Sequence, residues 1–237
     1  MCIMFLDIYH KLDNPAWYSL TESHQYFASG KDAVKRYPDN IVPFVACNPA
    51  KQDILTQMNE LIRSGESFFL IGDIPVATAS FASAGYTIES RLDCVQMICT
   101  SKIQLATTTQ IEELGETNDE EMLTLVNKVQ PGYYYAGTRL MGDYYGIRNQ
   151  GQLVAMAGER MRMDGLTEVS AVVTDPAFTG RGYAQQLVAH VANKNLSQSI
   201  IPFLHAAATN ERAIRVYELL GFVHRRIVAF WKIRREV

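Results

Sequence analysis

The chain has little of what marks a nucleic-acid-binding, membrane or secreted protein. Its 237 residues include 22 basic and 25 acidic side chains, and a net charge of −3 argues against a strongly basic surface for DNA or RNA. No apolar run is long enough to span a membrane. The opening MCIMFLDIYH has no positive start, and Asp7 interrupts its apolar run, so no secretory signal is expected. The expected location is therefore cytoplasmic.

Cysteine is also scarce. The four cysteines, Cys2, Cys47, Cys94 and Cys99, form no paired CxxC units, so in the absence of an export signal they are expected to be reduced thiols. Cys94 and Cys99 could in principle ligate a metal. Their spacing and the lack of a companion His or Cys pair favour packing in a strand instead. No metal cofactor is therefore predicted.

What is present is enough apolar material for a sizeable core: 48% of the residues are hydrophobic and 20% are charged. Residues 1–100 are expected to form a smaller N-terminal α/β region. Within it, Asn48 suits a helix cap and Pro49 the first helical position, ahead of an apolar stripe that Gly65 can end. Extended runs are expected at Ser67–Ile71 and Tyr86–Cys99.

Residues 101–237 have a denser and more regular pattern, which predicts a second domain of mixed α/β layout. Its hairpin is the clearest local feature, because Asn and Gly tolerate the positive φ of a tight turn. The expected elements are a strand at 102–106, a helix begun by Asn118 or Asp119, two strands within 142–163 joined at Asn149–Gly151, a strand at 166–174, a helix after Gly182, a strand at 202–209, a helix at 210–220 and a strand pair or long strand at 222–233.

The most informative stretch is VSAVVTDPAFTGRGYAQQL, from Val169 to Leu187. A strand ends at Thr174, and Gly180, Arg181 and Gly182 then open a helix. The first N–H groups of a helix have no partner inside it, and the helix dipole favours an anion there, so this turn is a candidate phosphate site. A glycine-rich turn between strand and helix can equally serve only to reverse the chain.

The sequence TGRGYA in this setting resembles the signature motif of the GNAT superfamily of acyl-CoA N-acyltransferases. The family pattern is Arg or Gln, two residues, Gly, one residue, then Gly or Ala. Gly182 and Ala184 match it, whereas Thr179 replaces the Arg or Gln and removes one side-chain contact. The resemblance implies that the turn holds the pyrophosphate of coenzyme A. It also implies that the backbone of Ala171–Thr174 pairs with the pantetheine arm like an added strand.

A second stretch, FLHAAATNERAIRVYELLGF, resembles a later GNAT motif. The matching residues are Asn210, Ala213, Tyr217, Gly221 and Phe222. The same residues also suit a helix cap, a helix stop and a buried stripe. The resemblance covers about 102–233. It implies a GNAT-like mixed, mostly antiparallel sheet flanked by helices, with a smaller N-terminal α/β region that can be a degenerate copy of the same fold.

Acyl transfer to an amine needs a proton acceptor, a proton donor and a stabilised oxyanion. Glu168 occupies a strand position at which similar family members carry a general base, and burial is expected to raise its pKa; a charge facing water at a strand end is the alternative. Tyr217 matches the tyrosine that similar proteins use to protonate the coenzyme sulfur. Glu159 and His205 are the alternative bases.

The resemblance thus predicts an acyl-CoA-dependent N-acetyltransferase, with acetyl-CoA as co-substrate and no metal. The acceptor is expected to be an amine of a small molecule, amino acid or peptide. A protein lysine or N-terminal acetyltransferase and a catalytically silent acyl-CoA sensor are the alternatives, and the chain is expected to be a monomer or homodimer. Aromatics that could line the acceptor cleft are Tyr133, Tyr134, Tyr135, Tyr144 and Tyr145. The predicted coenzyme contacts are Val172, Val173, Thr174, Thr179, Gly180, Arg181, Gly182, Tyr183, Ala184, Asn210 and Tyr217.

Overall fold

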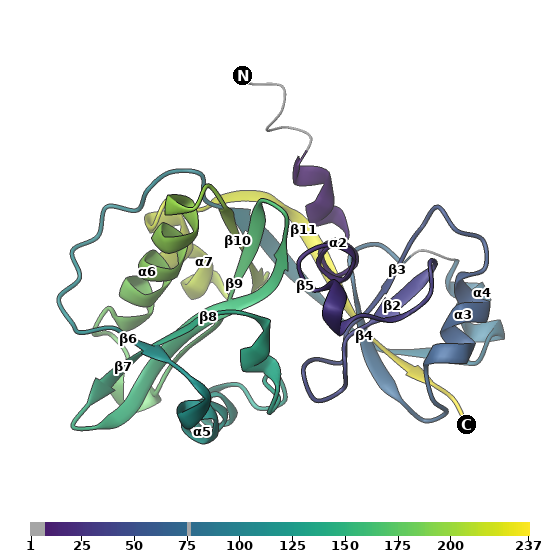
Figure 1. The fold of residues 1–237 in the computed structure, drawn as a ribbon, viewed down its shortest axis with the longest axis horizontal. Helices are drawn as coiled ribbons and strands as arrows, with labels where there is room; N and C mark the ends of the chain where they lie inside the picture. Colours follow the sequence, from purple (N-terminus) through teal and green to yellow (C-terminus); the bar gives the residue numbers. More distant parts are fainter. Residues whose placement is uncertain (1–7, 75–76) are drawn as a thin grey trace. The chain divides into compact units, whose positions relative to one another are not determined.

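The computed structural model describes residues 8–74 and 77–237, so the predictions for the opening segment and Cys2 lie outside the described residues (Figure 1). An eight-stranded sheet has the order β4-β11-β5-β10-β9-β8-β7-β6, and β1, β2 and β3 form a second, small sheet. Strands β9 and β10 pair in parallel, whereas β4 with β11, β6 with β7, β7 with β8 and β8 with β9 pair antiparallel. The predicted mixed, mostly antiparallel α+β fold is therefore confirmed.

The bounds of the elements follow the chain. The strands are β1 (Ser29–Gly30), β2 (Val34–Arg36), β3 (Val45–Cys47), β4 (Ser67–Ile71), β5 (Tyr86–Ile98), β6 (Glu112–Leu114), β7 (Tyr144–Asn149), β8 (Gln152–Met163), β9 (Leu166–Thr174), β10 (Ile201–Ala207) and β11 (Val223–Arg235). The α-helices are α2 (Pro15–Thr21), α3 (Ile54–Leu61), α4 (Thr78–Ser83), α5 (Asp119–Val129), α6 (Tyr183–Ser197) and α7 (Glu211–Leu219). The short 3-10 helices are η1 (Tyr9–Asp13), η2 (Gln25–Phe27), η3 (Glu116–Asn118), η4 (Thr138–Met141) and η5 (Pro176–Phe178).

The chain divides into two compact units. The first comprises residues up to Asp39, then 43–94 and 227–237, and the second comprises 40–42 and 95–226. The first unit therefore takes its last strand from the far end of the chain. The sequence predicts a domain boundary between residues 100 and 101, and this boundary stays a prediction.

In the first unit, α3 begins later than the sequence pattern indicates. Asn48 does not cap it, because its side chain accepts a hydrogen bond at 3.0 Å from the N–H of Ala50, and Lys51 N–H bonds back to Asn48 O at 3.1 Å. Asn48 and Pro49 thus form a separate turn, for which Asn is equally suited. The helix starts at Ile54, and its Ile54 and Met58 enter a core shared with Phe68 of β4.

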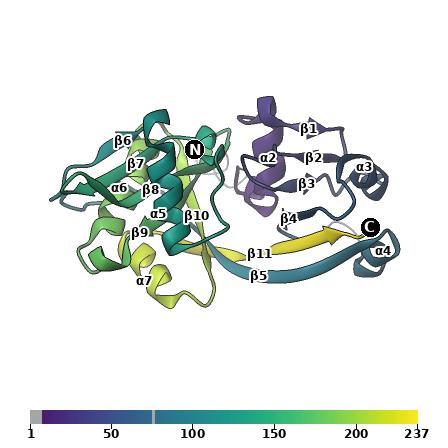
Figure 2. The ribbon, with the colours of Figure 1, turned by 90° about the horizontal axis from the view of Figure 1, so that it is seen from below.

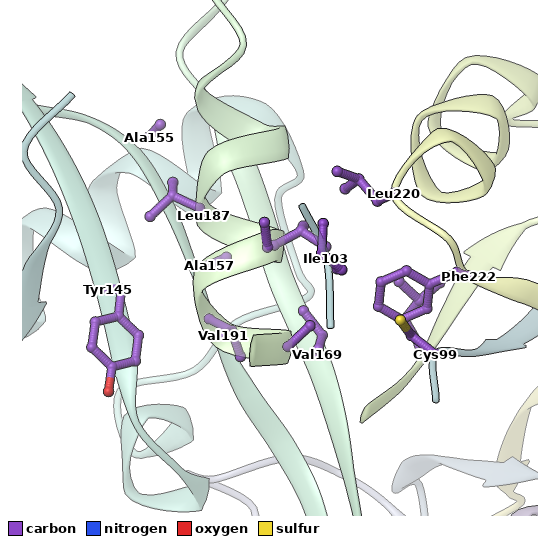
Figure 3. Close-up of a cluster of buried hydrophobic side chains, with 14 of the residues drawn as sticks. Cys99, Ile103, Tyr145, Ala155, Ala157, Val169, Leu187, Val191, Leu220 and Phe222 are labelled. Atoms are coloured by element: carbon purple, nitrogen blue, oxygen red, sulfur yellow. The ribbon is translucent and has the colours of Figure 1, made fainter. Parts of the chain in front are cut away.

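In the second unit, helices cover the two faces of the sheet. On one face lies α5 (Figure 2). Its Met122, Leu125 and Val126 pack with Tyr144 and Val173. On the other, α6 buries an apolar stripe against β8, β9 and α7. Figure 3 shows this second core, and the residues labelled there are Cys99, Ile103, Tyr145, Ala155, Ala157, Val169, Leu187, Val191, Leu220 and Phe222. The strands β9 and β8 are thereby fixed from both sides.

The strand predicted at Lys102–Ala106 is wrong. The connection from β5 to β6 instead runs past α6 as irregular chain, and we call residues 100–111 the strap (Figure 1). Asn193 of α6 replaces a strand partner, because its Oδ1 accepts from Ile103 N at 2.8 Å and its Nδ2 donates to Ile103 O at 3.0 Å. The apolar residues that suggest a strand at 102–106 include Ile103, which is buried in the hydrophobic core against α6.

We expect neither 1–100 nor 101–237 to fold as a separate protein. Residues Phe230–Arg234 pair with Ser67–Ile71, so the first fragment would have an unpaired β4 edge and the second a β11 without its partner. Circular dichroism of the separate fragments tests this. A matched chain in which 8–94 is joined by a flexible linker to 227–237 should fold better than 1–100. Two well-folded fragments from a cut near residue 100 would contradict the expectation.

Candidate functional site

The centre of the second unit is a bulge in β9. Met156 of β8 faces Val173, whereas Gly158 faces Ser170, so β9 contains one more residue than β8 over this interval. Ala171 absorbs the extra residue with φ of 50°, in the left-handed region that a residue with a Cβ seldom adopts. A bulge of this kind removes backbone groups from the ladder. The N–H groups near Val172 can therefore be directed elsewhere.

Strands β9 and β10 part beside this bulge. Their parallel pairing covers Leu166–Glu168 and Ile201–Phe203, although β9 continues to Thr174 and β10 to Ala207. The predicted coenzyme contacts Val172, Val173 and Thr174 all lie on the part of β9 beyond this pairing. The hydroxyl of Thr174 is buried and has no hydrogen-bond partner among the described residues. Such an unsatisfied group fits a strand edge that receives an extended ligand.

The glycine-rich turn follows β9 directly. Gly180 and Gly182 have φ of 78° and 74°, and Gly182 is the N-cap of α6. The first backbone hydrogen bond at the start of α6 runs from Gln186 N–H to Gly182 O at 3.1 Å. The N–H groups of Tyr183 and Ala184 lie before it in the chain, where a helix has no partner for them. Nothing lies within 4 Å of a Cβ built on Gly180. The turn therefore fits an anion, as the sequence predicts.

Two side chains of this turn have local partners. Thr179 Oγ1 donates to Pro176 O at 3.1 Å. The guanidinium of Arg181 lies 4.8 Å from the ring centroid of Phe178 and is otherwise exposed. The aromatic stack thus holds the Arg181 charge next to the turn.

The second motif lies on α7 and has the predicted local geometry. Asn210 caps the helix, because its side chain accepts from Ala213 N–H at 3.1 Å. Tyr217 packs against the α6 core with its ring centroid 6.1 Å from that of Phe222. Burial raises the pKa of Tyr217 to about 12, so its hydroxyl keeps its proton at neutral pH. A proton donor needs this state.

Glu168 has surroundings that the sequence pattern does not show. It is 1% exposed, and Arg160 Nε and Nη2 donate to its two carboxylate oxygens at 2.8 and 2.7 Å. Burial raises the pKa of Glu168, but the charge and hydrogen bonds of Arg160, assisted by His205, outweigh burial and lower the pKa to about 2. The prediction that the pKa of Glu168 is raised is therefore wrong. Glu168 is a stable anion in this arrangement.

His205 belongs to a hydrogen-bonded chain that includes Glu168. Its Nδ1 lies 2.8 Å from Glu168 Oε1, and its Nε2 lies 3.0 Å from Gln96 Nε2. Arg225 Nη1 donates to Gln96 Oε1 at 2.8 Å, which leaves the Gln96 amide nitrogen as the donor to His205 Nε2. In this direction, Nδ1 is the His205 nitrogen that donates to Glu168. The imidazole is thus oriented from both sides.

Arg160, Gln96 and Arg225 were missed by the sequence interpretation. Arg160 could have been found, because the turn at 164–165 sets Met163 opposite Leu166 and therefore places Arg160 near Glu168 across the hairpin. Gln96 and Arg225 come from strands remote in sequence, and no local pattern indicates them.

The alternative base Glu159 is enclosed by cations and amides. Arg162 Nε donates to it at 2.8 Å and Asn195 Nδ2 at 2.7 Å, with Lys194 Nζ at 3.3 Å. Its side chain is fully buried, and Asp143 N–H also donates to it. These contacts join β8 to α6. Glu159 therefore has a structural role in this arrangement.

The tyrosines proposed for the acceptor differ in exposure. Tyr133 is 58% exposed, whereas Tyr134 is buried, with its ring centroid 5.8 Å from that of Tyr144. The Tyr134 hydroxyl has no hydrogen-bond partner among the described residues. A separate groove of about 550 Å³ lies along α5 and is lined by Glu120, Lys128 and Asp175, among others. That groove does not include the turn at 179–184.

The described residues 8–74 and 77–237 contain no group of three or more His, Cys, Asp or Glu side chains that could hold a metal. Cys94 and Cys99 are buried, the Cys99 thiol donates to Ser101 O at 3.2 Å, and burial raises the pKa of Cys99. Over the same ranges, no helix combines the length and the apolar character that a membrane crossing requires.

Comparison with known proteins identifies the class to which this bulged sheet and glycine turn belong. The family described as "FR47-like protein" matches residues 144–231. A candidate acetyltransferase of the GNAT family from Novosphingobium aromaticivorans matches with 32% identity over 96% of this chain and 100% of that chain, with a TM-score of 0.86. No curated protein matches.

Two more distant structures share the fold. A GCN5-related N-acetyltransferase from Kribbella flavida has 14% identity over 92% of this chain and 91% of its own, with a TM-score of 0.61. A protein from Drosophila has 16% identity over 86% and 74%, with a TM-score of 0.66. The full-length match at 32% identity shows the family: the chain belongs to the GNAT acetyltransferases. Acyl-coenzyme A is the co-substrate that this family implies.

The lowered pKa of Glu168 predicts a specific acid sensitivity. The unfolded carboxyl titrates near 4.5 and the folded one near 2, so its ion pair with Arg160 stabilises the fold above the unfolded pKa, and this stability is lost as the pH falls through that interval. Urea unfolding between about pH 5 and 2.5 should show a steeper loss of unfolding free energy for the native chain than for Glu168→Gln. Parallel slopes would show that folding does not lower this pKa.

Proposed function

We propose that the protein is an N-acetyltransferase that moves an acetyl or other short acyl group from acyl-coenzyme A to an amine of a small molecule, amino acid or peptide. The observation that carries this proposal is the parting of β9 and β10 beside the bulge at Ala171, with an anion-binding turn at the end of the same strand. Together these features provide a strand edge for an extended arm and a cradle for its phosphates.

The residues fit coenzyme A at both ends. The N–H groups from Gly180 to Ala184 would hold the diphosphate, and Arg181 would add charge beside it. The backbone of Val172–Thr174 would pair with the pantetheine arm, and the buried Thr174 hydroxyl has no other partner among the described residues. Bound there, the coenzyme supplies an acyl group activated as a thioester. Asn210 would fix the start of α7 so that Tyr217 faces the sulfur.

The backbone of β9 would polarise the acyl carbonyl. The bulge at Ala171 shifts the pairing between β8 and β9 beside Val172. An N–H group there that faces away from β8 would stabilise the negative charge that develops on the carbonyl oxygen, as preorganised donors do. Tyr217 would give its proton to the departing sulfur. Its pKa of about 12 ensures that the proton is present.

We further propose that Glu168 and His205 act together as the base. A carboxylate with a pKa of about 2 is a weak proton acceptor, so Glu168 would not keep the amine's proton itself. Its charge, 2.8 Å from His205 Nδ1, would instead stabilise a protonated imidazole, and Nε2 is the atom left to receive the proton. This step requires the Gln96 amide to release Nε2.

A catalytically silent acyl-CoA sensor is the second candidate. The observation that favours it is that both candidate carboxylates are already paired, Glu168 with Arg160 and Glu159 with Arg162. A panel of amines incubated with acetyl-CoA and assayed for free coenzyme A separates the two functions. Turnover with any amine supports the transferase, and tight binding without turnover across the panel supports the sensor.

Replacing Gly182 by Val should abolish coenzyme A binding, because a β-branched side chain would occupy the phosphate cradle at a φ of 74° that it adopts poorly. Calorimetry with coenzyme A measures the affinity. Gly151→Val is the matched control: Gly151 has φ of 81° in the β7–β8 turn, with nothing within 4 Å of its built Cβ. The control should show similar backbone strain and native affinity. Unchanged affinity in a folded Gly182→Val variant would refute this placement.

Replacing Glu168 by Gln should lower kcat by roughly a hundredfold at neutral pH, with a smaller loss at high pH where free amine is abundant. His205→Gln should have a similar effect, and the double variant should be little worse than either, because the two residues act as one unit. Coenzyme affinity should stay near the native value. Tyr217→Phe should slow turnover less, since a thiolate leaves readily. Additive losses, or native turnover in Glu168→Gln, would reject the paired base.

A further inference from the structure

The glycine turn lacks the long side-chain donor that its motif carries elsewhere. Thr179 stands at the position of the Arg or Gln, and its hydroxyl is committed to Pro176 O at 3.1 Å. The side chain therefore stabilises the turn and does not extend over it. A diphosphate bound at 179–184 needs another side-chain donor if the lost contact is to be replaced.

Gln186, in the first turns of α6, has a donor in a suitable place. A helical side chain points back over the preceding turn, so Gln186 covers the helix start. Its Nε2 lies 3.9 Å from the position of a Cβ built on Gly182, the N-cap residue of the glycine turn. Gln186 is 5% exposed. A buried amide beside a phosphate cradle needs a polar partner.

The orientation of this amide is fixed by the strap. The N–H groups of Thr108 and Thr109 donate to Gln186 Oε1 at 2.8 and 3.1 Å, so the oxygen faces the strap and the NH₂ group faces the other way. Among residues 8–74 and 77–237, the hydrogen bonds of the Gln186 side chain all end on Oε1, and Nε2 makes none. The donor is thus oriented and available.

We propose that Gln186 Nε2 donates to the diphosphate of coenzyme A, in place of the side chain missing at position 179, and that coenzyme binding thereby fixes the strap onto α6. This inference rests on the proposed coenzyme site. The Gln186 oxygen holds the backbone of Thr108 and Thr109 while its nitrogen holds the phosphate. One side chain therefore links the coenzyme to a segment that is otherwise attached to α6 through Asn193.

The link has a structural consequence for the strap. Residues between its two attachments, Gln104–Thr107, are exposed, so they can detach when either attachment opens. A phosphate that immobilises the Gln186 amide should slow that opening. Hydrogen exchange at the N–H groups of Thr108 and Thr109 reports on it directly, because both donate to Gln186.

Gln186→Glu is the decisive variant. A carboxylate still accepts from Thr108 and Thr109, but it replaces the donor facing the diphosphate by a negative oxygen. Calorimetry should show coenzyme A affinity lower by about ten- to a hundredfold, the range expected for a hydrogen bond to a charged group. Gln198→Glu is the matched control, because it introduces the same amide-to-carboxylate change at the exposed C-cap of α6, away from the strap attachments. It should leave the affinity near native.

Hydrogen exchange supplies the second readout. Coenzyme A should slow exchange at Thr108 and Thr109 in the native chain and in Gln198→Glu, but not in Gln186→Glu. Equal affinity of Gln186→Glu and the native chain overturns the inference, as does an equal loss in Gln198→Glu, which would show a general charge effect. Absence of coenzyme A binding by the native chain overturns the proposed function itself, and this inference with it.

Discussion

The strained backbone at Ala171 is the constraint on which the candidate site depends. A residue with a Cβ at φ of 50° costs on the order of 1–3 kcal/mol, and the packing on both faces of β9 must hold it there. Val173 is fixed on the α5 side and Val169 on the α6 side. The extra residue shifts the pairing of β9 with β8, which resumes at Val173 and Thr174. The glycine turn and the start of α6 follow this part of β9 in the chain.

The buried charged side chains around β9 are held in ion pairs and hydrogen bonds that stabilise the fold. Glu168 and Glu159 are both buried, and each has an arginine within hydrogen-bond distance. Two neighbouring positions on the hairpin thereby tie β8 to different partners: Arg160 joins β8 to β9, and the Glu159 cluster joins it to α6. In the proposed mechanism, proton transfer therefore depends on the imidazole of His205, which lies 2.8 Å from Glu168. The low pKa of Glu168 results from its contacts with Arg160 and His205.

The sequence was most informative where a feature is local. The turn at 149–151, the helix start after Asn118, the strand at 166–174 and the helix after Gly182 all depend on neighbouring residues, and all are confirmed. Features that depend on distant residues were not predictable. The Lys102–Ala106 segment looks like a strand because Ile103 is buried, but its backbone partner is the side chain of Asn193. Arg160 makes the pKa shift of Glu168 a downward one, whereas burial alone would raise the pKa.

The placement of β11 also bears on how the chain is made. The pairs Phe230 with Ile71 and Arg234 with Ser67 join segments about 160 positions apart, and both lie in the first unit. During synthesis the ribosome delivers β4 long before its partner strand. The first unit therefore keeps an open edge until β11 is synthesised, while the second unit has all of its residues earlier. The unit that begins first is the one that is completed last.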